Sequence, residues 1–291
     1  VSSAASDVYK RQQYDDALRL QQAACQYVSP QHYPHIWAQS MIVKLSTYTN
    51  INDQDAMRTQ IALFPEVIAY LEAARHRDWM SFAYHVLSTA HATRQEMALA
   101  ITANDKSIQW SSDQVLTVAY VVTHFHRSLL YMYAGSYDLA QAVLAKLQDE
   151  VAPFNIPYYT ARLHMRLAAI EALLHNTISA QQHIVLSFEV LKSIGNIGEL
   201  LFVADIYSLI LYRQKRLRDA LEMSMLCSTI RDRYKIPRIS YIEQLVDSKR
   251  NKIPLEIVAQ VIPPAFDTTI YDLIGRLSDT YATIEEELVI P

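Results

Sequence analysis

Ten histidines are the residues most able to do chemistry in this 291-residue chain, because imidazole serves as acid, base and metal ligand. His124 and His126 stand two positions apart, which is about 200° around a helix of about 3.6 residues per turn. They would lie on opposite helix faces and could not chelate one ion together. His124 and His164 are forty residues apart, and neighbouring helices about 8–10 Å apart could let them share a ligand. We expect packed or groove-lining histidines and no metal site.

Other catalytic patterns are missing from the sequence. It contains no His-Glu-x-x-His or Cys-x-x-Cys zinc motif and no Gly-x-Ser-x-Gly nucleophile motif. Cys25 and Cys227 are far apart and have no activating neighbours, so they are expected to be reduced thiols of a cytoplasmic protein. Gly195 and Gly198 have the spacing of a nucleic-acid-clamping loop, but their place between two predicted helices indicates a turn. The acidic run 285–287 is expected to be a solvated face. We therefore expect no enzyme and no cofactor.

Composition narrows the fold class. Hydrophobic residues make up 51% of the chain and aromatic residues 10%, which excludes general disorder. Only four glycines occur, too few for a turn-rich β protein or a phosphate-binding loop. No stretch approaches the roughly 18 apolar residues of a membrane span. An all-α protein with no membrane partner is the expectation.

A small residue recurs along the chain at a nearly constant interval. The last four copies are forty residues apart, and the two earlier intervals are 39 and 44 residues. Periods of this size are typical of repeat proteins, whose units bury their apolar faces against neighbouring units. The spacing predicts about six pairs of helices, and the recurring residues are Ala17, Ala56, Ala100, Ala140, Ala180 and Ala220.

The clearest copy runs from Gly135, which can end a helix in the left-handed conformation, to Leu147. Tyr137 is the large residue expected between the paired helices, and Ala140 is the small one where they pass closest. Leu144 and Leu147 continue that face at helical spacing. This order of residues resembles the tetratricopeptide repeat family. The resemblance implies a right-handed α-α superhelix, or solenoid, of antiparallel helix pairs.

The other copies are less complete. Asn176 takes the place of the glycine in the next copy, and Leu217 takes the place of the tyrosine in the last. Asp53 is a plausible N-cap for a further second helix. Pro65 either kinks that helix or separates an extra short one, and Pro157 fits the first turn of another helix.

The repeat length of forty residues exceeds the usual tetratricopeptide length of about 34. Such long repeats resemble the sensor superhelix of signal-transducing ATPase-type bacterial regulators, over about residues 13–235. This resemblance implies a non-enzymatic, ligand- or protein-binding region of a larger bacterial signalling or transcription-regulatory protein. The alternative is a stand-alone adaptor between proteins. An enzyme or a nucleic-acid binder is the less favoured class.

Three segments are expected. Residues 1–12 resemble translated sequencing-adapter sequence and lack the apolar stretch of a signal peptide. We expect this leader to be non-native and the natural protein to begin upstream. Residues 13–236 should hold the repeats. Residues 237–291 should form a helical cap that covers the exposed end of the array.

The resemblance also implies a concave groove lined by the first helix of each pair. An aromatic, methionine-bearing groove with an occasional charge suits an extended peptide or a small ligand. In the alternative interpretation, the longer helices shift the register and these residues belong to the core. The candidate groove residues, taken in register with Ala140, are Phe82, His85, Thr89, Val122, Phe125, Leu129, Met132, Arg162, Met165, Phe202 and Asp205.

Basic residues concentrate in the segment 213–252. It holds eleven Lys and Arg against five acids, whereas the whole chain has a net charge of −4. The excess could be a solvated outer face, or it could dock an acidic partner. The interleaved acids and the length of the segment make nucleic acid an improbable partner.

Overall fold

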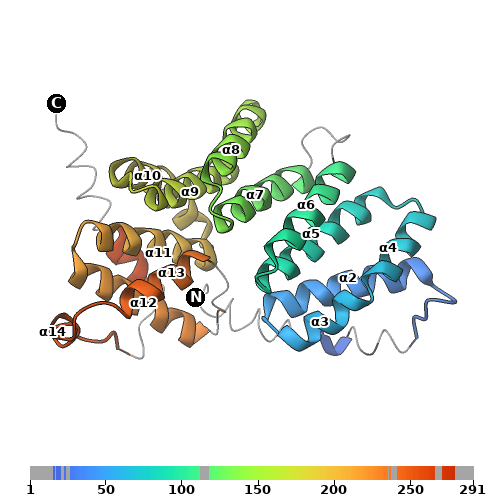
Figure 1. Cartoon of the computed structure of the whole chain (residues 1–291), viewed down its shortest axis with the longest axis horizontal. Coiled ribbons are helices and arrows are strands. Elements are labelled where there is room, and N and C mark those ends of the chain that lie inside the picture. The colour runs from blue at the N-terminus through green and yellow to red at the C-terminus, as the bar shows by residue number, and fades with distance from the viewer. Residues whose placement is uncertain are drawn as a thin grey trace. The chain divides into compact units, whose positions relative to one another are not determined.

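The computed structural model describes residues 16, 18–20, 23, 27–111, 118–234, 236, 241–265 and 271–278. In these residues the chain is all-helical and forms no β-strand, so the all-α prediction is confirmed there (Figure 1). The chain divides into two compact units between Leu147 and Gln148. The predicted leader 1–12, Ala17, Cys25 and the acidic run 285–287 lie outside the described residues.

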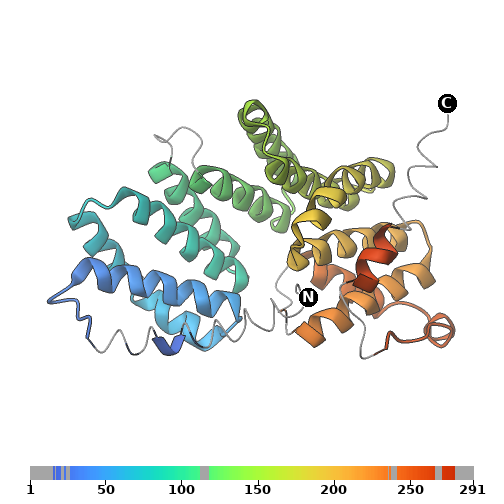
Figure 2. The same ribbon diagram turned by 180° about the vertical axis from the view of Figure 1, so that it is seen from behind.

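In the unit of residues 10–147, successive helices pack against one another. Helix α2 contacts α3, α4 and α5, and then α5 contacts α6 and α6 contacts α7 (Figures 1 and 2). Their apolar faces form a core around fully buried side chains such as Ile42, Leu45, Met57 and Leu71. The helices are α2 (Pro34–Asn50), α3 (Gln54–Ala62), α4 (Phe64–Ala73), α5 (Arg77–Thr93), α6 (Met97–Ser111), α7 (Val118–Tyr133) and α8 (Tyr137–Val151), which spans the boundary.

Helices α3 and α4 resolve the alternatives left open at Pro65. A single residue, Leu63, lies between the two helices, and Pro65 falls in the first turn of α4. Because proline lacks an N–H that this turn would leave unbonded, it starts a helix without cost. Asp53 caps α3 as predicted, since its Oδ1 accepts from the Ala56 N–H at 3.0 Å. Pro65 therefore separates an extra short helix.

In the unit that begins at residue 148, α11 is the central helix. It contacts α9, α10, α12 and α13, and every residue from Leu200 to Leu211 is buried. Pro157 lies in the first turn of α9, as predicted. The elements are η1 (Ala152–Phe154), α9 (Pro157–Leu173), α10 (Thr177–Ile194), α11 (Ile197–Arg213), α12 (Leu217–Tyr234), α13 (Tyr241–Arg250) and α14 (Leu255–Val258).

One tight turn recurs every forty residues. Residues 95, 135, 175 and 215 all have positive φ, between 61° and 75°. In each turn the next N–H bonds to the carbonyl five residues back, as from Ser136 to Tyr131 at 2.9 Å and from Arg216 to Leu211 at 3.0 Å. The alanine period therefore corresponds to a real structural period.

The turn geometry corrects two details of the predicted repeat register. His175, with φ 69°, occupies the place of Gly135, and Asn176 does not. The equivalent turn at Asn52 has φ 57°, which makes Met57 the counterpart of the recurring alanines. Met57 is fully buried, whereas its neighbour Ala56 is partly exposed. Both predictions were wrong by one residue, because apolar spacing does not locate the left-handed residue.

A serine faces two of the recurring alanines, Ala100 and Ala220. The Ser88 hydroxyl donates to the Ala100 carbonyl at 2.7 Å, and Ser208 donates to Ala220 at 2.9 Å. Small side chains at both positions let two helices approach closely, and the hydroxyl satisfies a carbonyl that the contact removes from water. Ala100 and Ala220 are thus each half of a paired contact whose serine was not predicted from the sequence.

Candidate binding pocket

A pocket of about 140 Å³ lies between α2 and α5. Three of its residues, Phe82, His85 and Thr89, are among the predicted groove residues. The residues of α2 were not among the predicted groove residues, because the groove register was carried from Ala140 only as far back as Phe82. The lining consists of Ser46, Thr49 and Asn50 from α2 and of Phe82, His85, Val86 and Thr89 from α5.

Helical spacing explains why these side chains share one surface. Phe82, His85 and Thr89 follow one another at intervals of three and four residues, so they lie on one face of α5. Val86 is buried and anchors this face, whereas the Phe82 side chain is 40% exposed. The Trp79 ring meets the Phe82 ring edge to face, with centroids 5.7 Å apart. The pocket therefore has an accessible aromatic surface held in a defined orientation.

The two threonines of the pocket use their hydroxyl hydrogens within their own helices. Thr49 Oγ1 donates to the Leu45 carbonyl at 2.8 Å, and Thr89 Oγ1 donates to the His85 carbonyl at 3.0 Å. A hydroxyl has one hydrogen and two lone pairs. Each threonine oxygen can therefore offer only acceptor sites to a ligand.

A buried polar network formed by His126 and Ser88 packs against the His85 ring. The His85 and His126 rings pack edge to face at 5.1 Å, and His126 Nε2 lies 2.9 Å from Ser88 Oγ. Since Ser88 donates its hydrogen to the Ala100 carbonyl, its oxygen must accept from His126 Nε2–H. The network therefore defines the tautomer of His126. It connects the pocket wall to the contact between α5 and α6.

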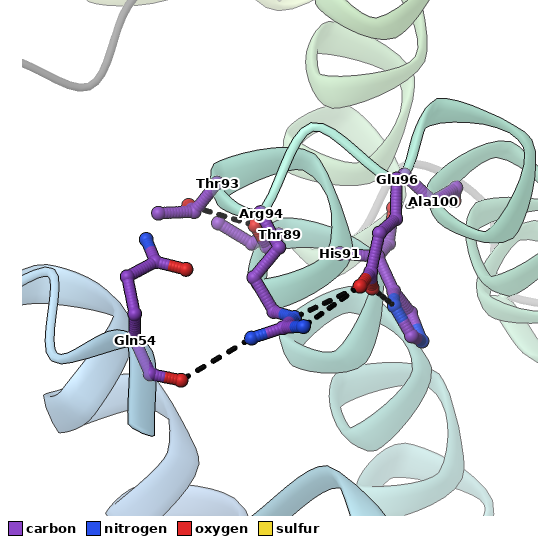
Figure 3. A network of polar contacts seen from close by, with 8 residues as sticks. Gln54, Thr89, His91, Thr93, Arg94, Glu96 and Ala100 are labelled. Carbon is purple, nitrogen blue, oxygen red and sulfur yellow. Dashed lines mark hydrogen bonds and ion pairs between the residues drawn. The ribbon is translucent and has the colours of Figure 1, made fainter. Parts of the chain in front are cut away.

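The turn after α5 is held by charged groups (Figure 3). Arg94 Nη2 and His91 Nδ1 contact the Glu96 carboxylate at 2.9 and 2.6 Å, and Arg94 Nη1 donates to the Gln54 carbonyl at 3.2 Å. Hydrogen bonds from Arg94 and then from His91 lower the pKa of the Glu96 carboxyl. These contacts tie the C-terminal end of α5, where Thr89 lies, to the start of α3.

On α7 the predicted groove residues divide into two groups. Val122 and Leu129 are half-buried. Phe125 and Met132 are each only 1% exposed. The prediction that Phe125 and Met132 line an open groove is wrong, because both side chains belong to the core.

In the second unit the structure also buries predicted groove residues. Met165, Phe202 and Asp205 are at most 8% exposed, and only Arg162 is half-buried. Helices α9, α10, α12 and α13 all contact α11, which carries Phe202 and Asp205, and α10 and α11 both contact α9, which carries Met165. The groove assignment is therefore wrong for these three buried residues.

The charged residues of this unit pair internally. Asp205 forms a two-pronged ion pair with Arg231, and the side chains are 2% and 4% exposed. Arg162 Nε lies 2.8 Å from Glu199 Oε1, which also accepts from the Tyr158 hydroxyl at 3.2 Å. Arg162 and Asp205, which were predicted to face a ligand, therefore pair with charged groups of the chain itself.

The basic segment 213–252 is similarly occupied by contacts within the chain. Several of its described cations contact acids or an aromatic ring of the chain itself, which reduces the charge left for an acidic partner. Lys235 and Arg238 lie outside the described residues. The internal partners are Asp219 for Arg216, Glu222 for Arg218, Asp247 for Arg250, Asp205 for Arg231 and the Tyr212 ring for Lys249.

Histidines meet directly between α9 and α10. His164 Nδ1 and His183 Nδ1 are 3.1 Å apart, so one nitrogen donates and the other accepts. The pKa of His164 is lowered mainly by burial and further by the neighbouring His183. The pKa of His183 is lowered by burial, and the nearby Glu171 carboxylate raises it in part. His124 instead donates from Nδ1 to the Tyr120 carbonyl at 2.9 Å. The described residues contain no group of three side chains suited to hold a metal ion.

The histidine pair should make stability depend on pH. In the folded protein both pKa values lie below the ordinary 6.5, so the unfolded chain binds protons more readily. The stabilisation that depends on the neutral histidine pair should therefore be fully present above pH 6.5. The free energy of unfolding should fall as the pH drops below that value. Urea unfolding between pH 7.5 and 5.5 measures the slope. The double variant His164→Gln/His183→Gln should have a smaller slope than the parent chain.

A matched control uses two exposed histidines. His35 and His76 also have neighbouring rings, with centroids 6.2 Å apart, but both are exposed. The double variant His35→Gln/His76→Gln should keep the slope of the parent chain. If removal of His164 and His183 leaves the slope unchanged, burial of this pair does not control it.

Among the described residues, no helix combines the length and the apolar character needed to cross a membrane. Comparison with protein-family models, curated proteins and solved structures gives no match to this chain.

Proposed function

We propose that this chain is a protein-binding scaffold without enzymatic activity, built as a right-handed, tetratricopeptide-like superhelix of helix pairs. Two features support the repeat architecture: the turn that recurs every forty residues and the small residues that meet between paired helices. Repeats of one geometry stack into extended surfaces suited to binding. The pocket between α2 and α5 anchors the partner on that surface.

The size of the pocket is the observation that carries this proposal. Sites for drug-sized ligands and cofactors hold about 300–1,000 Å³, whereas this pocket holds about 140 Å³. A cavity of about 150 Å³ accommodates one benzene molecule. The pocket therefore has room for one side chain. A peptide or protein segment can insert that side chain and lay its backbone along the helices, whereas a larger free ligand would stay mostly in water.

We further propose that the scaffold is the binding region of a larger bacterial signalling or transcription-regulatory protein. The forty-residue repeat length supports this, because it resembles the sensor superhelix of such regulators. A stand-alone adaptor is the second candidate. The division of the chain into two compact units favours it, because separate units can hold separate partners.

Filling the pocket should weaken partner binding. Peptides selected from a random phage-displayed library on the full chain should bind the Thr89→Trp variant at least about tenfold more weakly. The indole would occupy the volume that the anchoring side chain needs. Isothermal titration calorimetry with the selected peptides measures the change.

The control places the same substitution on an open surface. Thr102 lies exposed on α6 and makes the same type of hydroxyl bond, to the Ala98 carbonyl. The Thr102→Trp variant should keep the parental affinity. Failure to select any peptide, or equal binding to the Thr89→Trp and Thr102→Trp variants, would contradict the proposed function.

A further inference from the structure

We infer that the pocket between α2 and α5 is selective for a primary ammonium group, either the side chain of a partner's lysine or a free alkylamine. This inference rests on the proposed function and adds the chemistry of the anchoring group. It follows from the hydrogen-bonding state of the lining, the end of α2 and the exposed aromatic ring.

The two threonine oxygens of the lining accept hydrogen bonds and do not donate them. Thr49 and Thr89 have committed their hydroxyl hydrogens to the carbonyls of Leu45 and His85, so each presents only lone pairs. Asn50 adds an amide oxygen, and Ser46, His85 and the Asn50 amide group can also donate. An ammonium group has three donors and no acceptor, so it is the ligand group that suits the acceptor-only threonine oxygens. A carboxylate has only acceptors and would face the threonine oxygens without a shared hydrogen.

The pocket also lies at the negative end of a helix dipole. Thr49 and Asn50 belong to the last turn of α2, and that turn contains no basic residue. A cation near a helix C-terminus is stabilised by the dipole. A ligand ammonium would supply the positive charge that the helix end lacks.

The ring of Phe82 provides the third element. It is 40% exposed and forms part of the lining. A cation within about 6 Å of an aromatic centroid is attracted to the face of the ring. No lysine or arginine lines the pocket, so no fixed positive charge opposes the ligand. The pocket volume of about 140 Å³ admits the ammonium with the methylenes next to it.

The test uses small probes and the full chain. Saturation-transfer NMR should detect Nα-acetyl-lysine methylamide, with the strongest effect on the methylene next to the ammonium. The Nε-acetylated form of this probe, which lacks the charge, and capped glutamate should each bind at least about tenfold more weakly. A further arm with n-butylammonium separates the two sources. Binding weaker than that of capped lysine indicates a peptide side chain, and equal binding indicates a free amine.

The variants remove the acceptors without changing the shape of the lining. Thr49→Val/Thr89→Val should weaken binding of the capped lysine at least about tenfold. Thr59→Val is the matched control, because Thr59 makes the same type of bond, to the Asp55 carbonyl, on an exposed face of α3. This control should bind like the parent chain. Urea unfolding of all variants verifies that each is folded.

Two results would overturn the inference. The first is binding of the Nε-acetylated lysine or the capped glutamate as strongly as the capped lysine. The second is binding of the capped lysine that the double valine variant leaves unchanged. If selected peptides still lose affinity in the Thr89→Trp variant, the proposed function stands and only the chemistry of the anchor is wrong. If they do not, both are wrong.

Discussion

Replacing Asp205 with alanine should lower the free energy of unfolding by about 3–5 kcal/mol, because the substitution leaves a buried guanidinium without its partner. Asp205 on α11 and Arg231 on α12 bury all but 2% and 4% of their side chains. In the pair, the attraction between the two charges offsets the free-energy cost of removing them from water. A single buried charge has no such compensation. Urea unfolding at pH 7 measures the loss.

Two further variants define the origin of this effect. The double variant Asp205→Leu/Arg231→Met should recover much of the lost stability, because it removes both charges and keeps apolar volume. Arg218→Met breaks an ion pair whose arginine side chain is 62% exposed, and it should cost at most about 1 kcal/mol. If Asp205→Ala costs no more than this control, the pair does not stabilise the contact between α11 and α12.

Phe125→Ala should destabilise the protein by about 3–5 kcal/mol, because it removes a buried aromatic side chain and leaves a cavity in the core. Phe125 is 1% exposed, although the repeat register predicted that it would line an open groove. An open groove would leave much of the ring in water, and truncation would then cost little stability.

The matched substitution is Phe82→Ala. This ring lies in the pocket and is 40% exposed, so its loss should cost about 1–2 kcal/mol, clearly less than the loss at position 125. Thermal unfolding of both variants, with urea unfolding as a second measure, gives the comparison. Similar losses of stability at positions 82 and 125 would mean that Phe125 is not a core residue.

The recurring turn shows how far local sequence can predict this fold. Gly135 indicates a left-handed residue because only glycine adopts that conformation without a steric penalty. Gln95, His175 and Lys215 adopt it as well, with φ between 61° and 69°. At these positions the packing of the flanking helices outweighs the local preference. The period was therefore predictable, but the residue in each turn was not.

The pocket shows the corresponding limit for function. Phe82, His85 and Thr89 were predicted from register, and they line the pocket. Asp205 lies in the same repeat register as His85, yet it is buried against Arg231. The difference comes from the helices packed around each site, because α13 and α12 both contact α11. No local pattern around Asp205 contains that information.

The sequence by itself determined the helical class, the period and the small residues between paired helices. These properties depend on apolar spacing and residue size within a few turns of one helix. Only the tertiary structure decided which members of the predicted groove are open. Exposure depends on what covers a side chain, and the covering helices come from distant parts of the chain. For this reason Phe82 lines a pocket, whereas Phe125 packs in the core.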